Sequence, residues 1–452
     1  HEEHILELDI PDNYKIACQL KPNNKTLSAK TFDELADSPF IASASIQTDF
    51  YEVNGIKFYL HFNGDCNPDF EKIKKQFSAF TKVQLDFWGA CPADEYHFLF
   101  LVLPYKFYHG VEHQKSTVIV LGPGNALNEG KTYEDFLGVS SHELFHMWNV
   151  KFIRPKEMLP YDFTKENYAR TGYVYEGFTT YYGDVMLRKS NVFTDEQYFE
   201  TLEERLQKHF HNYGRFNLSV AQSSWETWLD GYVQGAPYRK TSIYDEGNLI
   251  ALMLDIMILR NTANKKSLKD VCRVLYIEFG KKNKGYSETD IIQLCEDAAG
   301  TSLKEFFKKY VYGTEDFEAM LNECFEYVGL EMQKKLNVNL KESNFGFKAA
   351  EQNQLLKISS IAPHSPAWKA GLSVGDDILS INGHEIKNDL SNLPQHFSNH
   401  QIELKVVSMG KTKTISVISK IGLNYFDTYK IAFKNSTSIH QKDNYSSWLL
   451  KH

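Results

Sequence analysis

The sequence predicts a multidomain α+β protein, and three observations support this fold class. First, 452 residues are more than one compact domain normally holds, so two to four domains are expected. Second, short alternating apolar runs, which are typical of strands, occupy much of the first hundred residues. Third, helical periodicity covers Tyr133 to about Val328, and short alternating runs return from Asn337 to Lys420.

The first hundred residues are predicted to be mainly strands and turns. A strand–turn–strand unit covers residues 6–20, and two further strand-like runs, Ile56–Leu60 and Phe98–Leu103, surround a helical segment over Asp69–Leu85. Residues 1–48 are too few for a stable β-sandwich. We therefore expect them to be the C-terminal part of a larger N-terminal β domain.

Helices are predicted to dominate the middle of the chain. Their starts are expected at Thr194, Ser287 and Thr301, where a hydroxyl residue precedes acidic ones. Further on, residues 378–381 are expected to form a strand that runs into a tight turn at Asn382–Gly383. The predicted boundaries are 49–335 for the central domain, 336–420 for a β-rich domain and 421–452 for a tail, which either packs through its aromatic residues or is partly mobile.

Composition excludes several classes of protein. The net charge of −8 argues against a nucleic-acid binder, which normally presents a basic face. No apolar run approaches the 18 or so residues of a membrane helix, since the longest, Leu249–Leu259, is interrupted by Asp255. The six cysteines form no CxxC pair, which favours free thiols over a cysteine metal site or a disulfide scaffold.

The N-terminal sequence does not indicate a cellular compartment. The chain begins with His1 rather than Met, and no signal-like segment follows. We expect either that a signal or a larger N-terminal piece has been removed, or that the chain starts inside the protein.

The segment Ser141–Asn149 carries the most informative motif. His142 and His146 are four residues apart, which on a helix places both imidazoles on one face, where they can bind one ion. Glu143 follows the first histidine and can reach a water on that ion. The alternative is that both histidines face solvent and that Glu143 is an ordinary surface glutamate.

A third ligand is expected downstream. Zinc in a catalytic site takes three protein ligands and an open position for water. Glu176 is the one acid in an aromatic-rich helical segment, where burial would be costly unless the carboxylate were paired or bound to metal. The structural alternative is a pair with Arg170 or Arg188. His142, His146 and Glu176 are thus predicted to hold one zinc ion, with Glu143 as the general base for the attacking water.

These motifs resemble those of the glycyl aminopeptidase family, a family of zinc peptidases in the gluzincin group. The resemblance rests on the segments just described, on the continuation of the histidine motif and on four more segments. These are residues 148–155 (Trp-Asn-Val-Lys-Phe-Ile-Arg-Pro), Asp33–Pro39, Gly110–His113, Glu176–Thr179 and Ile243–Gly247. The family implies a thermolysin-like zincin domain over 49–335, with a small β-sheet lobe and a mostly helical lobe, preceded by a β domain.

The resemblance also implies roles for two further residues. Glu112 would bind the free α-ammonium of the substrate through a charge-assisted hydrogen bond, and Tyr244 would donate its hydroxyl to the oxyanion. The alternatives are a solvent-facing glutamate and a core tyrosine. His113 would either contact a metal-ligating side chain or simply be packed.

Two departures from the family pattern are visible. The spacing from His146 to Glu176 is 30 residues, longer than in aminopeptidase N but as expected for this branch. Glu246 stands where many relatives have Lys, and this changes the charge beside Tyr244 and is expected to alter the pH profile.

The C-terminal β-rich segment resembles a PDZ domain. Phe345, Gly346 and Phe347 are similar to the PDZ carboxylate-binding loop, and residues 361–372 and 375–383 are similar to PDZ core segments. In that fold an extended peptide adds a strand beside the loop, so a C-terminal peptide is an expected ligand. The alternative is a blocked groove or a PDZ domain that only braces the catalytic domain.

Together, the residues and the resemblance predict a zinc aminopeptidase with one Zn²⁺ per chain. It would release N-terminal residues from peptides, with a leaning to Gly and Ala that the resemblance implies. A zinc endopeptidase with the same site is the first alternative. The second is a catalytically degenerate scaffold that binds peptides through its PDZ domain. No nucleic-acid partner and no transmembrane segment are expected.

Overall fold

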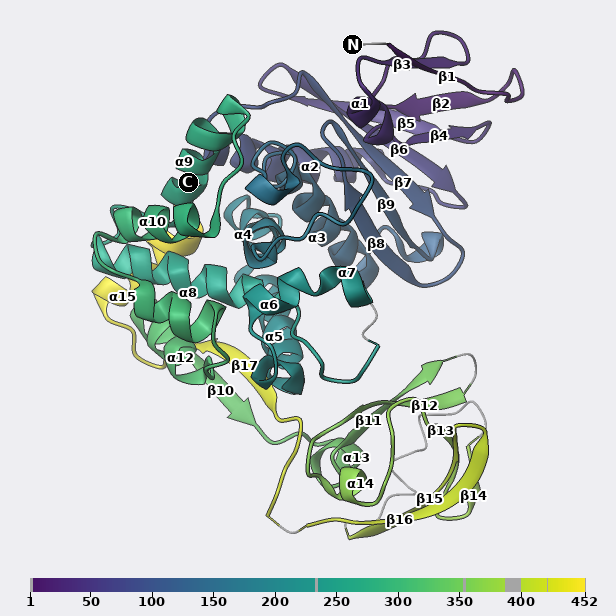
Figure 1. Cartoon of the computed structure of the whole chain (residues 1–452), viewed down its shortest axis with the longest axis vertical. Helices are drawn as coiled ribbons and strands as arrows, with labels where there is room; N and C mark the ends of the chain where they lie inside the picture. Colours follow the sequence, from purple (N-terminus) through teal and green to yellow (C-terminus); the bar gives the residue numbers. More distant parts are fainter. Residues whose placement is uncertain (1–2, 232–234, 353–354, 387–399, 421, 452) are drawn as a thin grey trace.

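The computed structural model describes residues 3–231, 235–352, 355–386, 400–420 and 422–451. The N-terminal residues form two antiparallel strand pairs joined by a short helix (Figure 1), and Ala17 and Ile41 of these pairs pack with Leu99 and Val118 of the central sheet. These elements are β1 (His4–Glu7) with β3 (Thr26–Ala29), β2 (Lys15–Cys18) with β4 (Phe40–Ser43), and α1 (Phe32–Ala36). Cys18, Leu20, Leu27 and Ala29 form a small core of their own.

A five-stranded sheet follows, in the order β5-β6-β7-β9-β8. Its strands are β5 (Gln47–Val53), β6 (Ile56–Gly64), β7 (Glu95–Val102), β8 (Phe107–Glu112) and β9 (Ser116–Gly122). Strands β6, β7 and β9 are parallel, and α2 (Phe70–Trp88) provides the crossover from β6 to β7 that a parallel pair needs. Strand β8 is antiparallel to β9 and forms the edge that lies against helix α3 (Gly130–His146).

The helical lobe is built around α8 (Asp245–Asn261), which is buried along most of its length. Asp255, which interrupts its apolar run, accepts hydrogen bonds from the Tyr181 hydroxyl at 2.6 Å and from the backbone N–H of Leu268 at 2.8 Å. Around α8 lie α4 (Thr179–Lys189), α5 (Asp195–His211), α6 (Val220–Trp225), α7 (Thr227–Asp230), α9 (Leu268–Val274), α10 (Glu288–Ala299), α11 (Lys304–Phe306) and α12 (Glu318–Tyr327).

Short 3₁₀ and π-helical turns complete this lobe. The 3₁₀ turns are η1 (Gly124–Ala126), η2 (Lys156–Met158), η4 (Tyr213–Phe216) and η6 (Gly280–Lys282), and the π turns are η3 (Tyr173–Phe178), η5 (Leu275–Phe279) and η7 (Phe307–Val311). The predicted helix starts at Thr194 and Ser287 are the N-caps of α5 and α10, each with a capping box. The third predicted start, the segment Thr301–Glu305, contains the first residue of α11, Lys304. None of the described helices is both long and apolar enough to cross a bilayer.

The C-terminal β domain has its own core and an antiparallel sheet, ordered β11-β12-β13-β15-β16 with β14 paired to β13. Its elements are α13 (Leu340–Ser343), β11 (Phe347–Gln352), β12 (Leu355–Ile361), α14 (Pro366–Lys369), β13 (Asp377–Ile381), β14 (His384–Glu385), β15 (Gln401–Ser408) and β16 (Lys411–Ile418). The turn predicted at Asn382–Gly383 is present, with φ of +50° and +80° at the two residues.

After this domain the chain returns to the helical lobe. Strand β17 (Thr428–Phe433) pairs with β10 (Leu330–Lys335), and Figure 1 shows these two strands as the connection to the C-terminal β domain. Helix α15 (Ile439–Tyr445) and the π turn η9 (Ser446–Leu450) then pack on the lobe, where the buried Trp448 donates its indole N–H to the Tyr181 hydroxyl at 2.7 Å. The described part of the tail therefore packs through its aromatic residues. All six cysteines are free thiols.

Candidate active site

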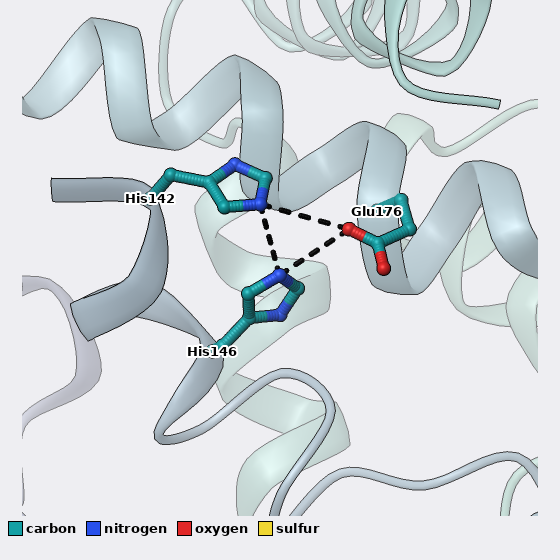
Figure 2. A group of neighbouring side chains, drawn as sticks. All are labelled: His142, His146 and Glu176. Atoms are coloured by element: carbon teal, nitrogen blue, oxygen red, sulfur yellow. Dashed lines mark hydrogen bonds and ion pairs between the residues drawn. The ribbon is translucent and has the colours of Figure 1, made fainter. Parts of the chain in front are cut away.

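The two histidines of α3 lie one helical turn apart and point at each other and at Glu176 (Figure 2). The Nε2 atoms of His142 and His146 are 2.9 Å apart, and Glu176 Oε2 is 3.6 Å from the first and 3.3 Å from the second. Glu176 comes from the π turn η3, directly before α4. The structure thus brings together the three residues predicted to bind metal.

This group has the chemistry of a cation site. His146 donates its Nδ1–H to the carbonyl of Asn149 at 2.7 Å, which leaves the lone pair of a neutral ring on Nε2, directed at the other two residues. Glu176 Oε2 is buried and accepts no hydrogen bond. Two ligands of a tetrahedral zinc ion lie about 3.3 Å apart, and the three separations found here bracket that value. The residues therefore fit a His₂Glu zinc site.

The alternative partners expected for Glu176 are engaged elsewhere. Arg188 donates to Asp195 at 2.7 Å, and Arg170 lies over the ring of Trp225. Burial alone would raise the pKa of Glu176, but the adjacent imidazoles outweigh burial and lower it. Burial likewise opposes a charge on His146, yet the carboxylate of Glu176 raises the pKa of His146 to about 10. The site thus attracts positive charge.

Glu143 lies in the same cleft, beneath the edge strand β8. A Cβ added to Gly110 of this strand would overlap the Oε1 atom of Glu143, so the glycine makes room for the carboxylate. The Glu143 side chain is buried, and burial raises its pKa although the nearby His146 opposes this shift. The predicted base is therefore a buried carboxylate on the same helix as His142 and His146.

Glu112 is the last residue of β8 and lies beside these groups. Ligand atoms of Glu112, Glu143 and His146 all lie within 4.8 Å of one another. The turn that follows Glu112 is anchored by Asp37, whose carboxylate accepts from His113 Nδ1 at 3.1 Å, from the Gln114 backbone N–H at 2.8 Å and from Lys151 Nζ at 2.7 Å. His113 thus contacts Asp37 rather than a metal ligand.

Tyr244 is the residue directly before α8 and lines the cleft. Its ring centroid is 6.4 Å from that of His142. Side chains of helix α5 contact the two residues that follow Tyr244. Arg205 binds Asp245 at 3.1 Å. His209 Nδ1 lies 3.3 Å from Glu246 Oε2. Neither Arg205 nor His209 was predicted, because their sequence neighbourhood is that of an ordinary amphipathic helix.

The turn η3 and helix α8 meet backbone to backbone. A Cβ added to Gly177 would lie 2.5 Å from the Cα of Gly247, and one added to Gly247 would lie 2.6 Å from the Cα of Gly177. Each glycine directly follows an acidic residue of the site region, Glu176 or Glu246.

The cleft that joins these residues has a volume of about 570 Å³. It is bounded by β8, α3, η3, α5 and the start of α8, and it extends from Glu112 past the metal ligands to Arg205 and Lys131. A volume of this size accommodates several residues of a peptide. All six residues predicted for the catalytic site line it: Glu112, His142, Glu143, His146, Glu176 and Tyr244.

The predicted carboxylate loop of the C-terminal β domain is tightly packed. Phe345 and Phe347 are fully buried in the core of that domain, and Gly346 between them has a φ of +76°. The Gly346 N–H donates to the Glu342 carbonyl at 3.2 Å, and its carbonyl accepts from Ala362 at 2.8 Å. Ligand binding by this loop stays a prediction.

The fold and the site define a peptidase joined to a PDZ domain. The comparison with known families agrees with this class of protein. The M61 glycyl aminopeptidase family matches residues 135–250, the peptidase M61 N-terminal domain matches residues 1–44, and the PDZ domain matches residues 357–407. The chain is therefore similar to the M61 glycyl aminopeptidases in its N-terminal and catalytic parts, and the resemblance seen in the sequence is confirmed.

One solved structure has the same fold over nearly the whole chain. An aminopeptidase N family protein from Idiomarina loihiensis is 26% identical, with a TM-score of 0.88 over 99% of this chain and 79% of that one. An M1 zinc metallopeptidase mutant from Deinococcus radiodurans, bound to a Tyr-Ser-Ala substrate, is 13% identical, with a TM-score of 0.44 over 68% of this chain and 62% of that one. No curated protein matched the sequence.

Proposed function

We propose that the protein is a zinc-dependent aminopeptidase that releases N-terminal residues from peptides. The observation that carries the proposal is the position of Glu112, whose carboxylate lies within 4.8 Å of ligand atoms of Glu143 and His146. An anion at this distance from the reacting centre can hold a substrate ammonium one residue away from the scissile bond. A peptide with a blocked N-terminus would leave this partly buried carboxylate without an ammonium partner.

His142, His146 and Glu176 are the residues that would hold the zinc ion. When bound, zinc would polarise the substrate carbonyl and make a water more acidic. Its positive charge would also counter the burial that raises the pKa of Glu143.

The remaining groups divide the chemistry between them. Glu143 takes a proton from the attacking water and passes it to the leaving amine. Tyr244 donates its hydroxyl to the carbonyl oxygen as negative charge develops there. Glu112 fixes the substrate register through the N-terminal ammonium, so that one residue is removed at a time. The family resemblance implies Gly and Ala as favoured first residues.

Two alternative functions make different predictions. A zinc endopeptidase would use the same base and ligands but would not need a free amine at Glu112. A degenerate scaffold would bind peptides through the PDZ domain without turnover. The complete set of ligands, base and amine anchor in one cleft favours the aminopeptidase over both.

The test is hydrolysis of aminoacyl p-nitroanilides beside the same substrates with an acetylated amine, with and without a chelator. We expect chelator-sensitive cleavage of the free-amine substrates alone. The Glu143→Gln variant should keep its zinc and lose nearly all turnover, at least about 100-fold. Equal cleavage of acetylated substrates would favour the endopeptidase, and no cleavage with stoichiometric zinc would favour the scaffold.

A further inference from the structure

We propose that a cavity between helix α5 and the PDZ domain is a subsite for the C-terminal part of peptide substrates, and that it favours segments that carry carboxylates. The proposal rests on the proposed function, because it takes the substrate amine to be bound at Glu112. The cavity has a volume of about 510 Å³ and adjoins the catalytic cleft, since Lys208 of α5 lines both.

The direction of a bound substrate leads to this cavity. With its ammonium at Glu112 and one residue before the scissile bond, a peptide has the rest of its length beyond the metal ligands. The catalytic cleft continues there to Arg205 and Lys208. Helix residues three apart are neighbours on one face, so His211, which lines the second cavity, continues the row of Arg205 and Lys208. A peptide that follows this row passes from the cleft into the second cavity.

The length of this row sets the length of the substrate. Arg205 and His211 are six residues apart on α5, which corresponds to about 9 Å along the helix axis. An extended chain covers this distance with about three residues. Because the first residues occupy the cleft between Glu112 and α5, a peptide of roughly six residues is needed to enter the second cavity. Aminoacyl p-nitroanilides are too short to reach it.

The lining of the cavity contains cations and hydrogen-bond donors. Lys208 of α5 and Lys348 of β11 supply two positive charges, and Gln207, Asn212, Ser359 and Ser360 supply amides and hydroxyls. Among the described residues that line this cavity there is no carboxylate, although the whole chain has a net charge of −8. A concave surface with cations of one sign attracts anions.

The charge of Lys348 is not neutralised by its closest contacts. His211 donates its Nε2–H to the Asp427 carbonyl at 2.7 Å, so its Nδ1 lone pair accepts a hydrogen bond from Lys348 Nζ at 2.8 Å. This imidazole is neutral, because burial and the charge of Lys348 lower the pKa of His211 to about 4. The ammonium also lies over the ring of Phe426, at 5.0 Å from its centroid. Both contacts are with neutral groups, and a substrate carboxylate would supply the counter-charge.

The acids that act on these two lysines from a distance have other partners. Glu342, which attracts Lys348, accepts hydrogen bonds from two asparagine side chains. Asp184, which Lys208 stabilises as an anion, is paired with Arg205 at 3.5 Å. Within the described ranges of the chain, neither Lys208 nor Lys348 is in an ion pair. Both ammonium groups can therefore bind a carboxylate that enters the cavity.

The walls of the cavity are held together before substrate binds. The Tyr238 hydroxyl, from the segment before α8, accepts a hydrogen bond from the Ile361 backbone N–H at 3.1 Å and forms another with the Ser360 hydroxyl. The contact between His211 and Lys348 joins the same two domains. Figure 1 shows β11 and β12 on the side of the PDZ domain that is nearest to the helical lobe. The subsite is therefore built from both domains.

The test compares hexapeptides that begin with Ala, have amidated C-termini and differ only in their last two residues, Glu-Glu, Gln-Gln or Lys-Lys. We expect kcat/KM of the zinc-loaded protein to be at least about fivefold higher for Glu-Glu than for Gln-Gln, and lowest for Lys-Lys. This preference should shrink at high salt, which screens charges that are partly exposed. The Gln-Gln peptide with a free C-terminal carboxylate shows whether the terminal carboxylate is bound as well as acidic side chains.

The variants are judged by the ratio of the Glu-Glu and Gln-Gln values, so a general loss of activity cancels. In the double variant Lys208→Gln/Lys348→Gln this ratio should fall to within about twofold of one. The control is Lys369→Gln, at an exposed lysine of α14 in the same domain, which should keep the wild-type ratio. Calorimetry with the zinc-loaded Glu143→Gln variant provides a readout without turnover and should rank the Glu-Glu peptide tighter.

The outcomes separate this proposal from the proposed function. Equal use of the Glu-Glu and Gln-Gln peptides by an active enzyme, or a preference that survives the double variant, would overturn the subsite and leave the aminopeptidase proposal intact. If no free-amine substrate is cleaved, the proposed function fails instead, and the subsite fails with it.

Discussion

Glu246 Oε2 lies 3.3 Å from His209 Nδ1, and both side chains are almost completely buried in the helical lobe. The hydroxyl of Thr241 donates to the same carboxylate oxygen. Arg205, one turn before His209 on α5, binds Asp245. Helix α5 therefore holds both residues that follow Tyr244, and the position of Tyr244 depends on contacts that Glu246 makes away from the cleft.

Replacing Glu246 is expected to impair turnover through Tyr244. In Glu246→Gln the contact with His209 loses its charge, so we expect kcat to fall about 10-fold, worth about 1.4 kcal/mol, with KM changed less than twofold. Steady-state kinetics on a free-amine p-nitroanilide measures kcat and KM separately. Glu200→Gln, at an exposed position on α5, the helix that carries His209, is the control and should behave as wild type. An unchanged kcat in Glu246→Gln would show that these contacts do not position Tyr244.

Gly110 is expected to be needed for the position of the base. A methyl group at this residue would overlap Glu143 Oε1, so Gly110→Ala should displace the carboxylate and lower kcat at least about 100-fold. Zinc content, measured by metal analysis, should stay at one per chain, because none of the three ligands moves. Val111→Ala on the same strand, whose side chain points to the opposite face, is the control. Full activity in Gly110→Ala would mean that Glu143 is not the base or has room to relocate.

Removing the metal, or one of its predicted ligands, should impair zinc-dependent turnover. Dialysis against a chelator should abolish turnover, and added zinc should restore it. Glu176→Ala should weaken zinc binding by about 10-fold to 100-fold or more, since it removes one of three protein ligands. Competition with a zinc indicator dye measures this affinity. Unchanged affinity would exclude Glu176 as a ligand.

Asp37 should stabilise the fold in a pH-dependent way. Burial raises its pKa, but the hydrogen bond with His113 and the charge of Lys151 outweigh burial and lower it. A carboxyl with a depressed folded pKa stabilises the protein above its unfolded value of about 3.9, and this stability is lost as the pH falls through the folded value. Asp37→Asn should therefore lower the free energy of unfolding by about 2 kcal/mol at pH 7.

Urea denaturation at steps from pH 7 to pH 3 measures this difference between wild type and Asp37→Asn. The difference should narrow below about pH 4, since Asp37 of the unfolded wild-type chain then takes up a proton more readily than the folded carboxylate does. Asp12→Asn removes an exposed ion pair with Lys25 from the same N-terminal segment and should change stability little at any pH. A difference for Asp37→Asn that stays constant down to pH 3 would contradict the ion-pair origin of the effect.

Destabilising the PDZ domain should not change the turnover of small substrates. Gly346→Ala places a methyl group onto Ser365 at a φ of +76°, so we expect it to destabilise the C-terminal β domain. Turnover of p-nitroanilides should stay within twofold of wild type, because this loop does not line the catalytic cleft. A large loss of turnover would indicate that the PDZ domain supports the catalytic domain.

Local spacing was sufficient to predict that His142, His146 and Glu176 lie together, because one helical turn separates the two histidines and a buried acid needs a partner. The fold class, the helix caps at Thr194 and Ser287 and the turn at Asn382 also follow from short-range patterns. These features depend on residues within a few positions of one another, which is where sequence patterns are informative.

The residues that position the site were not predictable in this way. Asp37 reaches Gln114 across 77 residues, and Arg205 reaches Asp245 across 40, so only the folded chain brings them together. Gly110 carries no signal of the carboxylate that it accommodates. The return of β17 to pair with β10 likewise depends on tertiary packing, because strand pairing at such a separation leaves no local pattern.

The contact between Gly177 and Gly247 has a mechanical consequence. With no side chain between the two backbones, the segment bearing Glu176 cannot shift without carrying the start of α8 and Tyr244 with it. Glu112 belongs instead to the edge strand of a separate sheet. Glu176 and Tyr244 are therefore expected to move together, whereas Glu112 belongs to the sheet and is not coupled to them through this contact.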